Sequence, residues 1–327
     1  MSLVDFWYRS PCLIAYLLLP FSLIFRGIVS IRRFFYRVGI KKTTTFSVPI
    51  IVVGNIVVGG AGKTPLVIWL VKLLQQHGYK PGVISHGYGV KNIIKPQVVT
   101  ANSLVSDVGD EAVLVARHVA CPVVIASTRS NAINELLKYG CDVIVGDDGL
   151  QHYAMGRDIE IAVVDAQRLF GNGYFLPAGP LRESVSRLKT VDFVVYNGAC
   201  EEAENIMKLL PDKLTAVADF KQHVELTELI GKSIHAIAGI GNPERFFQTL
   251  QQLGFTVIKH SFPDHYNFKS SDINFGKDEI VIMTEKDAVK CQKFADNRHW
   301  FLPISAVLNE GFEKNLLLKL KACAKRG

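Results

Sequence analysis

A glycine-rich segment that ends in lysine and threonine contains the residues of this sequence most suited to chemistry on phosphates. It runs from Gly54 to Thr64 and reads Gly-Asn-Ile-Val-Val-Gly-Gly-Ala-Gly-Lys-Thr. Glycines let the backbone approach a phosphate, Lys63 can reach the terminal phosphates of a nucleoside triphosphate, and the Thr64 hydroxyl can coordinate Mg²⁺. The residues expected to bind the nucleotide are Gly59, Gly60, Ala61, Gly62, Lys63, Thr64 and Pro65.

The elements on either side of this segment must present it to a ligand. Val48 to Val53 is a short apolar run rich in β-branched residues, typical of a buried strand in a parallel sheet. Pro65 to His77 carries apolar residues at helical spacing, and the pattern stops at Gly78. The glycine segment therefore ends at a predicted helix N-terminus, where unpaired amides and the helix dipole favour an anion.

The segment departs from the common phosphate-loop pattern at one position. That pattern places a glycine five residues before the Gly-Lys pair, where this chain has Val57, and the first glycine lies three residues earlier at Gly54. A glycine turn without chemical function is the alternative. The flanking strand and helix, together with the Gly-Lys-Thr ending, favour phosphate binding.

Two adjacent carboxylates provide the partner that such a loop requires. In Cys141-Asp-Val-Ile-Val-Gly-Asp-Asp, three β-branched residues lead to Asp147 and Asp148 at the carboxyl end of a predicted strand. Ligands of open parallel sheets bind at this end of the strands. Neighbouring carboxylates repel one another unless a cation lies near them, which favours a Mg²⁺ site over a solvated turn, the alternative for this segment.

Three further polar segments could lie near such a site. Gly149-Leu150-Gln151-His152 and Leu176 to Glu183 carry no general catalytic signature, and alone they are typical of ordinary loops and rigid turns. Val108-Gly109-Asp110-Glu111 is typical of a helix start, where acidic side chains complement the dipole. Asp110 is of particular interest, because phosphoryl transfer to a hydroxyl needs a base near the acceptor.

The N-terminal part of the chain is first apolar and then basic. Ser10 to Phe25 is an uncharged run of 16 residues that contains Pro20, slightly shorter than the roughly 20 residues that span a bilayer. A spanning helix, a helix in the membrane interface and a buried helix of a soluble protein remain open. A signal peptide is disfavoured because the positive charges follow the apolar run. Those charges are Arg26, Arg32, Arg33, Arg37, Lys41 and Lys42.

The position of this basic cluster, within a formal net charge of +7, indicates the expected partner. Arginines beside Phe34, Phe35 and Tyr36 are typical of residues that lie among lipid headgroups. The positive-inside bias then keeps the rest of the chain in the cytoplasm. Nucleic acid is not expected as a partner, since no basic stripe continues beyond Lys42.

The remaining sequence alternates short apolar runs with helical patterns, which is typical of a parallel sheet with helices on both faces. Predicted strands lie near 48–53, 81–85, 122–127, 142–146, 159–165 and 192–197, and predicted helices near 65–77, 110–119 and 129–139. Polar residues dominate between Glu201 and Lys232, which we interpret as the connection to a second unit. That unit is expected to contain strands at 234–240, 256–260 and 279–283, a helix opening at 242–244 and a final helix near 312–324.

The predicted fold class is therefore α/β: a P-loop NTPase-like parallel sheet, a smaller second α/β domain and an N-terminal membrane-associated helix. The expected boundaries are 1–42 for the N-terminal segment, 43–225 for the P-loop domain and 226–327 for the smaller domain. With 327 residues, 49% of them hydrophobic, the chain has ample material for two cores. Its six cysteines form no C-x-x-C pair, so cysteine-based metal or redox chemistry is not expected.

Seven motifs, in order along the chain, resemble the tetraacyldisaccharide 4'-kinase family, the lipid A 4'-kinases of Gram-negative bacteria. They are Gly-Asn-x-x-Val-Gly-Gly-x-Gly-Lys-Thr-Pro at 54–65, His-Gly-Tyr-Gly at 86–89, Gly-Asp-Glu at 109–111, Asp-Asp-Gly-Leu-Gln-His at 147–152, Leu-Arg-Glu at 181–183, Ala-Gly-Ile-Gly-Asn-Pro at 238–243 and Thr-Glu-Lys-Asp-Ala at 284–288. The resemblance extends from the N-terminal apolar segment to near Lys290. It departs at Ala61, where the family usually has Ser or Thr, and at His86, where it usually has Arg.

This resemblance implies transfer of the γ-phosphate of ATP to the 4'-hydroxyl of a tetraacyldisaccharide 1-phosphate, with Mg²⁺, at the cytoplasmic face of the bacterial inner membrane. We expect a monomer with a lipid substrate. The implied catalytic residues are Lys63, Asp110 and His265, and the implied metal ligands are Thr64, Asp147 and Asp148. Residues implied to surround the phosphates and the substrate head group are Gln151, His152, Arg182, Glu183, Asn242, Arg129 and Tyr88.

Two other classes of phosphate-loop protein compete with a kinase. Membrane-associated regulatory ATPases carry a signature lysine at the start of Lys-Gly-Gly-x-Gly-Lys-Thr, and this chain has Val58 at that position. A GTPase switch requires Asn/Thr-Lys-x-Asp to read guanine, whereas Thr284-Glu285-Lys286-Asp287 has its lysine one place too late. Both alternatives therefore lack a residue that defines their class.

Overall fold

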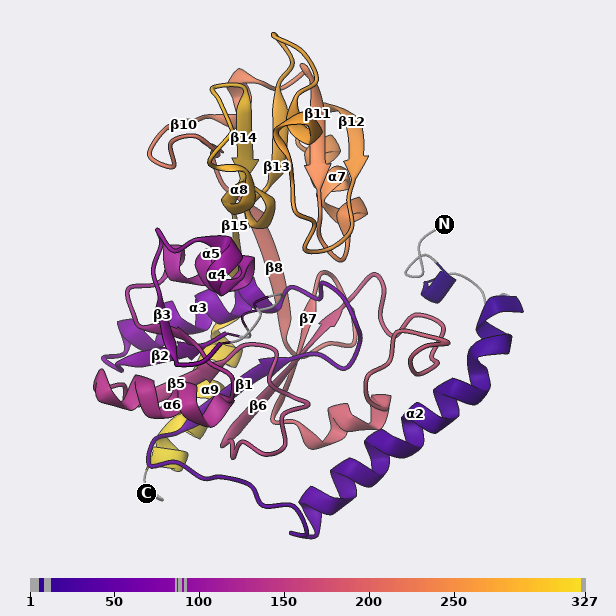
Figure 1. Ribbon diagram of the computed structural model, residues 1–327, viewed down its shortest axis with the longest axis vertical. Helices are drawn as coiled ribbons and strands as arrows, with labels where there is room; N and C mark the ends of the chain where they lie inside the picture. Colours follow the sequence, from indigo (N-terminus) through magenta and orange to yellow (C-terminus); the bar gives the residue numbers. More distant parts are fainter. Residues whose placement is uncertain (1–5, 9–12, 86, 88–89, 91–92, 325–327) are drawn as a thin grey trace.

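The computed structural model describes residues 6–8, 13–85, 87, 90 and 93–324, arranged in two lobes (Figure 1). The larger lobe is built on a nine-stranded sheet and the smaller lobe on a six-stranded sheet. Strands β8 (Ile206–Pro211) and β15 (Ile304–Val307), at one end of the larger sheet, run toward the smaller lobe and connect the two.

The larger sheet has the order β15-β8-β7-β6-β1-β5-β2-β4-β3. Its other members are β1 (Ile50–Gly54), β2 (Pro81–Ile84), β3 (Gln97–Val99), β4 (Val123–Ile125), β5 (Val143–Gly146), β6 (Ile159–Asp165) and β7 (Phe193–Asn197). Neighbours pair in parallel except at the two ends, where β3 and β15 run antiparallel to β4 and β8. Parallel pairing brings the loops after β1, β5 and β6 together at one edge of the sheet.

Helices cover both faces of this sheet, which confirms the predicted fold class. They are α3 (Lys63–Gln76), α4 (Val105–Val108), α5 (Asp110–His118), α6 (Arg129–Lys138) and α9 (Glu310–Ala324). Along β1, Ile51 and Val53 share a core with α3, α5 and α9, whereas Ile50 and Val52 share a core with α6. The alternation follows from the geometry of a strand, in which successive side chains point to opposite faces.

The smaller sheet has the order β10-β9-β14-β13-β11-β12. Its strands are β9 (Leu214–Ala216), β10 (His223–Val224), β11 (Ser233–Ala238), β12 (Thr256–Ser261), β13 (Val281–Thr284) and β14 (His299–Leu302). Helix α7 (Pro243–Gln252) packs on one face through Phe247 and Leu250, and α8 (Glu285–Cys291) packs on the other through Ala288. Short 3₁₀ helices lie at η1 (Val185–Thr190), η2 (Leu226–Glu228) and η3 (Ser270–Ile273).

The C-terminal half differs from the sequence-based prediction in two respects. The segment 201–232, interpreted as a connection, contains β8, β9 and β10. The final helix, α9, was expected in the smaller domain, but Phe312, Leu316 and Leu320 pack it into the core of the larger sheet. An amphipathic pattern predicts a helix without saying which of two sheets it covers, so 226–327 was too long a range for the smaller unit.

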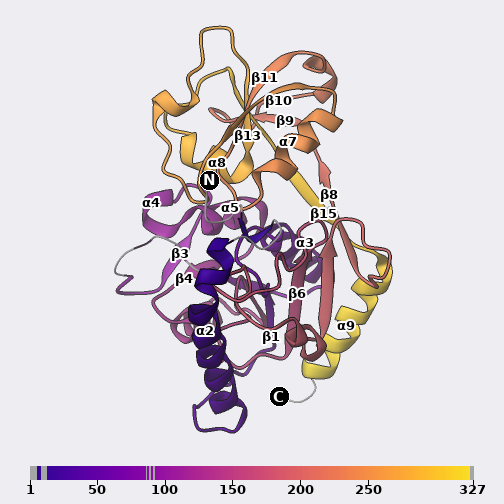
Figure 2. The same cartoon turned by 90° about the vertical axis from the view of Figure 1, so that its right-hand side faces the viewer.

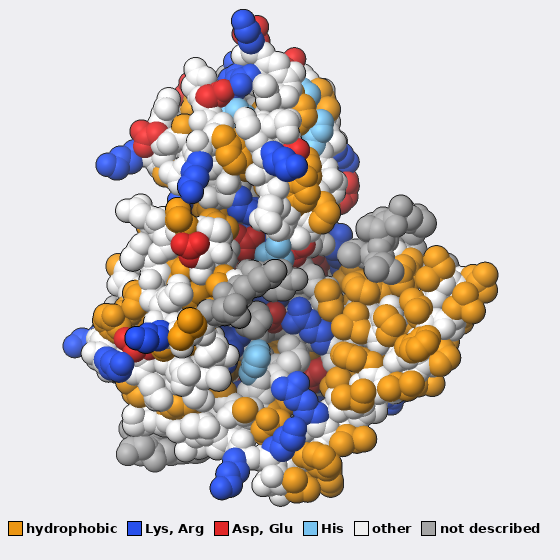
Figure 3. Space-filling model, viewed as in Figure 1, with side chains coloured by type: hydrophobic (Ala, Val, Ile, Leu, Met, Phe, Trp, Pro, Cys, Tyr) orange, Lys and Arg blue, Asp and Glu red, His pale blue; other side chains and the backbone are white. Residues whose placement is uncertain are grey.

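Helix α2 (Leu13–Arg37) is continuous over 25 residues and lies along the outside of the larger lobe (Figure 2). Its apolar side chains are largely exposed, for example Leu17 at 67% and Phe21 at 59%, and orange side chains cover this helix in Figure 3. The alternative of a buried helix is therefore wrong. By length and composition α2 is able to cross a membrane, and only 11% of its most apolar stretch is buried. The Ser22 hydroxyl ties it to the lobe by donating to the Phe175 carbonyl.

Candidate active site

The glycine segment connects β1 to α3, and two of its glycines adopt conformations that other residues rarely adopt. Gly59 and Gly62 have φ values of 109° and 91°, in the left-handed region. Helix α3 begins at Lys63, followed by Thr64, directly after Gly62. The first amides of the helix are therefore at the loop, as the prediction of a phosphate site requires.

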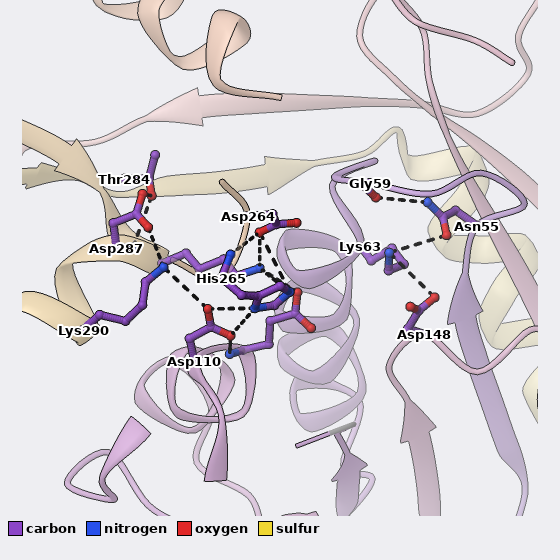
Figure 4. A network of polar contacts seen from close by, with 12 residues as sticks. Asn55, Gly59, Lys63, Asp110, Asp148, Asp264, His265, Thr284, Asp287 and Lys290 are labelled. Carbon is purple, nitrogen blue, oxygen red and sulfur yellow. Dashed lines mark hydrogen bonds and ion pairs between the residues drawn. The ribbon is translucent and has the colours of Figure 1, made fainter. Parts of the chain in front are cut away.

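Lys63 lies among polar groups of the same lobe (Figure 4). Its Nζ is 3.5 Å from Oδ1 of Asn55 and 3.7 Å from Oδ1 of Asp148. Arg182 donates from Nη1 to Oδ2 of Asp148 at 3.0 Å. Burial raises the pKa of Asp148, but the charges of Lys63 and Arg182 outweigh it and lower that pKa to about 2. Asp148 is therefore an anion held between two cations.

Asp147 is buried with its carboxylate left open. It is 2% exposed, and neither carboxylate oxygen has a hydrogen-bond partner among the described residues. Burial and the negative charge of Glu111 raise the pKa of this carboxyl, while Lys63 opposes them. Mg²⁺ takes one or two carboxylates together with phosphate and water oxygens. The buried Asp147 carboxylate, whose oxygens accept no hydrogen bond from the described residues, fits such an ion beside Asp148.

A second polar cluster joins the two lobes (Figure 4). Asp110 is the first residue of α5, His265 follows β12, and Nδ1 of His265 lies 3.0 Å from each carboxylate oxygen of Asp110. His265 adopts a φ of 59°, which is uncommon outside glycine. Burial raises the pKa of Asp110, but its hydrogen bond with His265 and the charge of Lys286 lower that pKa to about 2.

Both clusters line one cavity of about 1090 Å³ between the lobes. The larger lobe contributes the loop from Gly59 to Pro65 and Asp148, and the smaller lobe contributes His265. Helix α2 adds the apolar residues Phe25, Ile28 and Val29, and the cation Arg32. Figure 3 shows blue Lys and Arg side chains in the hollow between the orange face of α2 and the lobes.

The structure brings most of the residues expected near the substrate to this cavity. The residues that line it are Gln151, His152, Arg182, Glu183 and Asn242. Arg129 is not one of the residues that line the cavity, but it contacts one of them: its Nη2 donates to the backbone carbonyl of Asp148 at 3.2 Å. Tyr88 and His86 lie outside the described residues. Contact between these side chains and a substrate stays a prediction.

Two of these residues are already engaged within the protein. Glu183, 1% exposed, accepts hydrogen bonds from Gln151 Nε2 at 2.8 Å and from the Tyr153 hydroxyl. Asn242 caps α7 and donates from Nδ2 to Oδ2 of Asp165 at 3.2 Å. Glu183 therefore orients Gln151, and Asn242 ties the smaller lobe to the larger one.

Sequence reasoning missed several residues that hold the site together. Asn197, at the end of β7, donates from Nδ2 to the carbonyl of Ala61 at 3.0 Å. This hydrogen bond holds the backbone of the phosphate loop against the neighbouring strand. Arg245 of α7 pairs with Asp165 at 3.1 Å across the lobes. Lys286 lies in the quoted 284–288 motif without an assigned role. Asn197 and Asp165 lie at the ends of strands, where ligands of parallel sheets bind, and this position was the sequence signal that could have indicated them.

The chain is similar to known proteins over most of its length. The family model described as LpxK, tetraacyldisaccharide-1-P 4'-kinase, matches residues 14–321. A tetraacyldisaccharide 4'-kinase of Methylobacillus flagellatus is 50% identical over 93% of this chain and 91% of its own length. Another, from Coxiella burnetii, is 48% identical over 95% of this chain and 92% of its own.

A solved structure is similar over the same extent. The crystal structure of LpxK from Aquifex aeolicus in complex with ATP superposes with a TM-score of 0.78 at 28% identity, covering 94% of this chain and all of that one. With a family match over most of its length and relatives near 50% identity, the chain belongs to the tetraacyldisaccharide-1-P 4'-kinase family.

Proposed function

We propose that this chain transfers the γ-phosphate of ATP to the 4'-hydroxyl of tetraacyldisaccharide 1-phosphate in lipid A biosynthesis. Its relatives carry the name of that reaction. The observation that carries the proposal in this chain is one cavity lined by the phosphate loop, by His265 of the Asp110 pair and by apolar residues of α2. A nucleotide, a sugar hydroxyl and the start of an acyl chain can meet there.

On the nucleotide side, the chain supplies positive charge and fixed amides. The loop amides and Lys63 bind the phosphates, and Arg182 adds a second cation at the same end of the cavity. Phosphoryl transfer depends mainly on positioning and on neutralising the charge of the transferred group. Ala61 lacks the hydroxyl that the family usually has there, but it leaves the amides of the loop in place.

We assign Asp147, Asp148 and Thr64 to Mg²⁺. The open oxygens of buried Asp147 support the assignment. When bound, the ion neutralises phosphate charge and helps to orient the triphosphate. Mg²⁺ usually takes one or two carboxylates together with phosphate and water oxygens, so the two aspartates suffice for such an ion.

On the acceptor side, Asp110 accepts the proton of the 4'-hydroxyl. The lowered pKa of Asp110 keeps it ionised at neutral pH, so the base is always in its working form. A weak base of this kind takes the proton late, as the bond to phosphorus forms. His265 holds the Asp110 carboxylate in place, and we assign Gln151 and His152, which line the cavity, to the sugar head group.

The exposed helix α2 supports action at the cytoplasmic face of the inner membrane. Its apolar face is suited to acyl chains, and Arg32, Arg33 and Arg37 near its C-terminal end are suited to lipid phosphates.

The direct test is incubation of the purified protein with γ-labelled ATP and tetraacyldisaccharide 1-phosphate in detergent, followed by thin-layer separation. We expect label in the lipid, dependent on Mg²⁺. Hydrolysis of ATP without labelled lipid would indicate the regulatory ATPase, and a strong preference for GTP would indicate the switch. Either result contradicts the proposal.

A further inference from the structure

Three residues ahead of α2 are packed into the larger lobe, and the proposed mechanism gives them no role. Phe6 and Trp7 are only 5% and 8% exposed, and Tyr8 packs beside them. The Trp7 indole donates to the carbonyl of Pro177 at 3.0 Å, and the Trp7 carbonyl accepts from the amide of Asn172 at 2.8 Å. This segment is therefore fixed to the lobe by its side chains and by its backbone, unlike the exposed helix that follows it.

Tyr8 extends this segment to the phosphate loop. Its hydroxyl donates to the carbonyl of Val58 at 3.3 Å, and the amide of Val58 donates to the carbonyl of Pro180 at 2.8 Å. Burial raises the pKa of Tyr8, so the phenol keeps its proton at neutral pH and remains a donor. Both polar groups of the Val58 backbone are thus engaged directly before Gly59, where the backbone takes its left-handed conformation. The Tyr8 hydroxyl therefore helps to fix the start of the loop assigned to the phosphates.

Arg168 lies in the loop after β6, between Tyr8 and the smaller lobe. Its guanidinium carbon is 4.7 Å from the centroid of the Tyr8 ring, which is within the range of a cation–π contact. Nη1 of the same side chain donates to the carbonyl of Gly241 in the smaller lobe. The backbone of Arg168 is held as well, because its amide donates to Oδ1 of Asp165 at 3.2 Å. One guanidinium therefore contacts the N-terminal segment and the smaller lobe at the same time.

The part of the smaller lobe that Arg168 contacts packs directly on the phosphate loop. A Cβ added to Gly241 would lie 2.3 Å from the amide nitrogen of Gly60, and one added to Gly60 would lie 3.6 Å from Cα of Gly241. Both glycines also line the cavity. The hydrogen bond from Arg168 to the Gly241 carbonyl therefore acts on the backbone that covers the loop.

We propose that Arg168 is a positioning residue that holds Gly241 on the phosphate loop, and that the Tyr8 ring orients its guanidinium. The inference rests on the proposed function, in which phosphate is transferred inside this cavity. A planar guanidinium suits both tasks, because it stacks on an aromatic ring through its face and donates hydrogen bonds from its edge. The two side chains act on transfer through the contact between Gly241 and Gly60, which sets how closely the smaller lobe approaches the nucleotide.

A double-mutant cycle tests whether the two side chains act as one unit. The transfer rate from labelled ATP to tetraacyldisaccharide 1-phosphate is measured in a single turnover at saturating ATP, with the full chain in detergent micelles. Arg168→Met, which loses the charge and the donors, should slow transfer about tenfold and leave the Kd for ATP within about twofold. Tyr8→Leu, which loses the ring, should slow transfer about fivefold. The double variant should be about tenfold slower and not about fiftyfold, because Tyr8 acts through Arg168.

Conservative variants separate positioning from a general loss of structure. Arg168→Lys keeps a cation and a donor without the planar face, so it should slow transfer only about threefold. Tyr8→Phe keeps the ring and loses the hydroxyl, so it should transfer at the wild-type rate but bind ATP about threefold more weakly. Tyr139→Phe and Lys189→Met, at exposed positions of the larger lobe, should match the wild type. Arg168→Gln, which lacks the charge, replaces Arg168→Met in the cycle if that variant does not fold.

The outcomes separate this proposal from the proposed function. A double variant about fiftyfold slower than the wild type overturns the coupling of Tyr8 with Arg168, and a wild-type rate in Arg168→Met overturns the positioning role. Absence of lipid phosphorylation in the wild type would instead contradict the proposed function. The same cycle is then measured on the free energy of unfolding, where additive effects of Tyr8→Leu and Arg168→Met overturn the contact between the two side chains.

Discussion

Two polar clusters line the same cavity and are built differently (Figure 4). The first, around Lys63, takes Asn55, Asp148 and Arg182 from segments of the larger lobe. The second, around Asp110, takes its partners His265, Lys286 and Lys290 from the smaller lobe. The phosphate cluster is therefore complete within one lobe, whereas the acceptor cluster exists only when the two lobes meet.

This difference separates nucleotide binding from readiness for transfer. A loop, a strand end and a helix N-terminus in one lobe can bind ATP whatever the position of the other lobe. Asp110 contacts His265 at 3.0 Å and Lys290 at 3.7 Å, and both partners belong to the smaller lobe, so both contacts depend on how the two lobes meet. We therefore expect damage to the first cluster to abolish transfer, and damage to the second to slow transfer without weakening ATP binding.

The largest effect is expected from Lys63→Ala. Removing the cation that reaches the phosphates should lower the rate of lipid phosphorylation by at least about 10³-fold, because charge on the transferred group is left uncompensated. The rate is measured with labelled ATP, and circular dichroism checks the fold. Lys72→Ala, an exposed position on α3, should keep the wild-type rate. A Lys63→Ala variant at full rate would remove the basis of the whole mechanism.

Asp110→Asn should be nearly as damaging to kcat but should spare nucleotide binding. The amide cannot accept the hydroxyl proton, so we expect kcat to fall by about 10² to 10³-fold while the Kd for ATP, measured by calorimetry, changes less than about twofold. The exposed Asp107→Asn on α4 is the control. Loss of ATP binding in Asp110→Asn would show that the two clusters are not separable.

His265→Ala should have a smaller effect, because Asp110 keeps its amide hydrogen bond from Glu111 and its lysine neighbours. We expect kcat to fall about 10 to 100-fold through loss of alignment, again with an unchanged Kd for ATP. His223→Ala, at an exposed position on β10, is the control for loss of an imidazole. Equal activity of the His265→Ala variant and the wild type would contradict the cross-lobe pair.

Gly241→Ala tests the contact between the lobes directly. A Cβ on Gly241 of the smaller lobe would overlap the amide nitrogen of Gly60 in the phosphate loop, so the lobes could not approach fully. We expect about a tenfold fall in the single-turnover rate. Gly27→Ala on α2, with nothing within 4 Å of the new Cβ, should be neutral. A wild-type rate in Gly241→Ala would mean that transfer does not need this approach.

The same contrast explains what the sequence could predict. The phosphate cluster comes from local motifs whose geometry follows from a strand, a turn and a helix, so Lys63, Asp147 and Asp148 were found from residue types and spacing. The pairing of Asp110 with His265, 155 residues apart, came only from the family resemblance. Lys286 lies in a quoted motif and Asn197 at the end of a predicted strand, but neither pattern shows what the side chain contacts, which depends on how distant segments pack. The position of α9 was mispredicted for the same reason.

The smallest expected effect concerns stability and pH. The pKa of Asp110 falls from 3.8 to about 2 on folding, so its carboxylate stabilises the fold above pH 4, by about 2 kcal/mol, and that contribution disappears as the pH falls from about 4 to about 2. Asp110→Asn should therefore lower Tm by about 4 °C at pH 7, and the difference should shrink as the pH is lowered toward 3. Asp107→Asn, at an exposed position on α4, is the matched control. A difference for Asp110→Asn that stays constant with pH would mean that His265 and the α8 lysines do not act on Asp110 in the folded protein, and the acceptor cluster would lose its electrostatic basis.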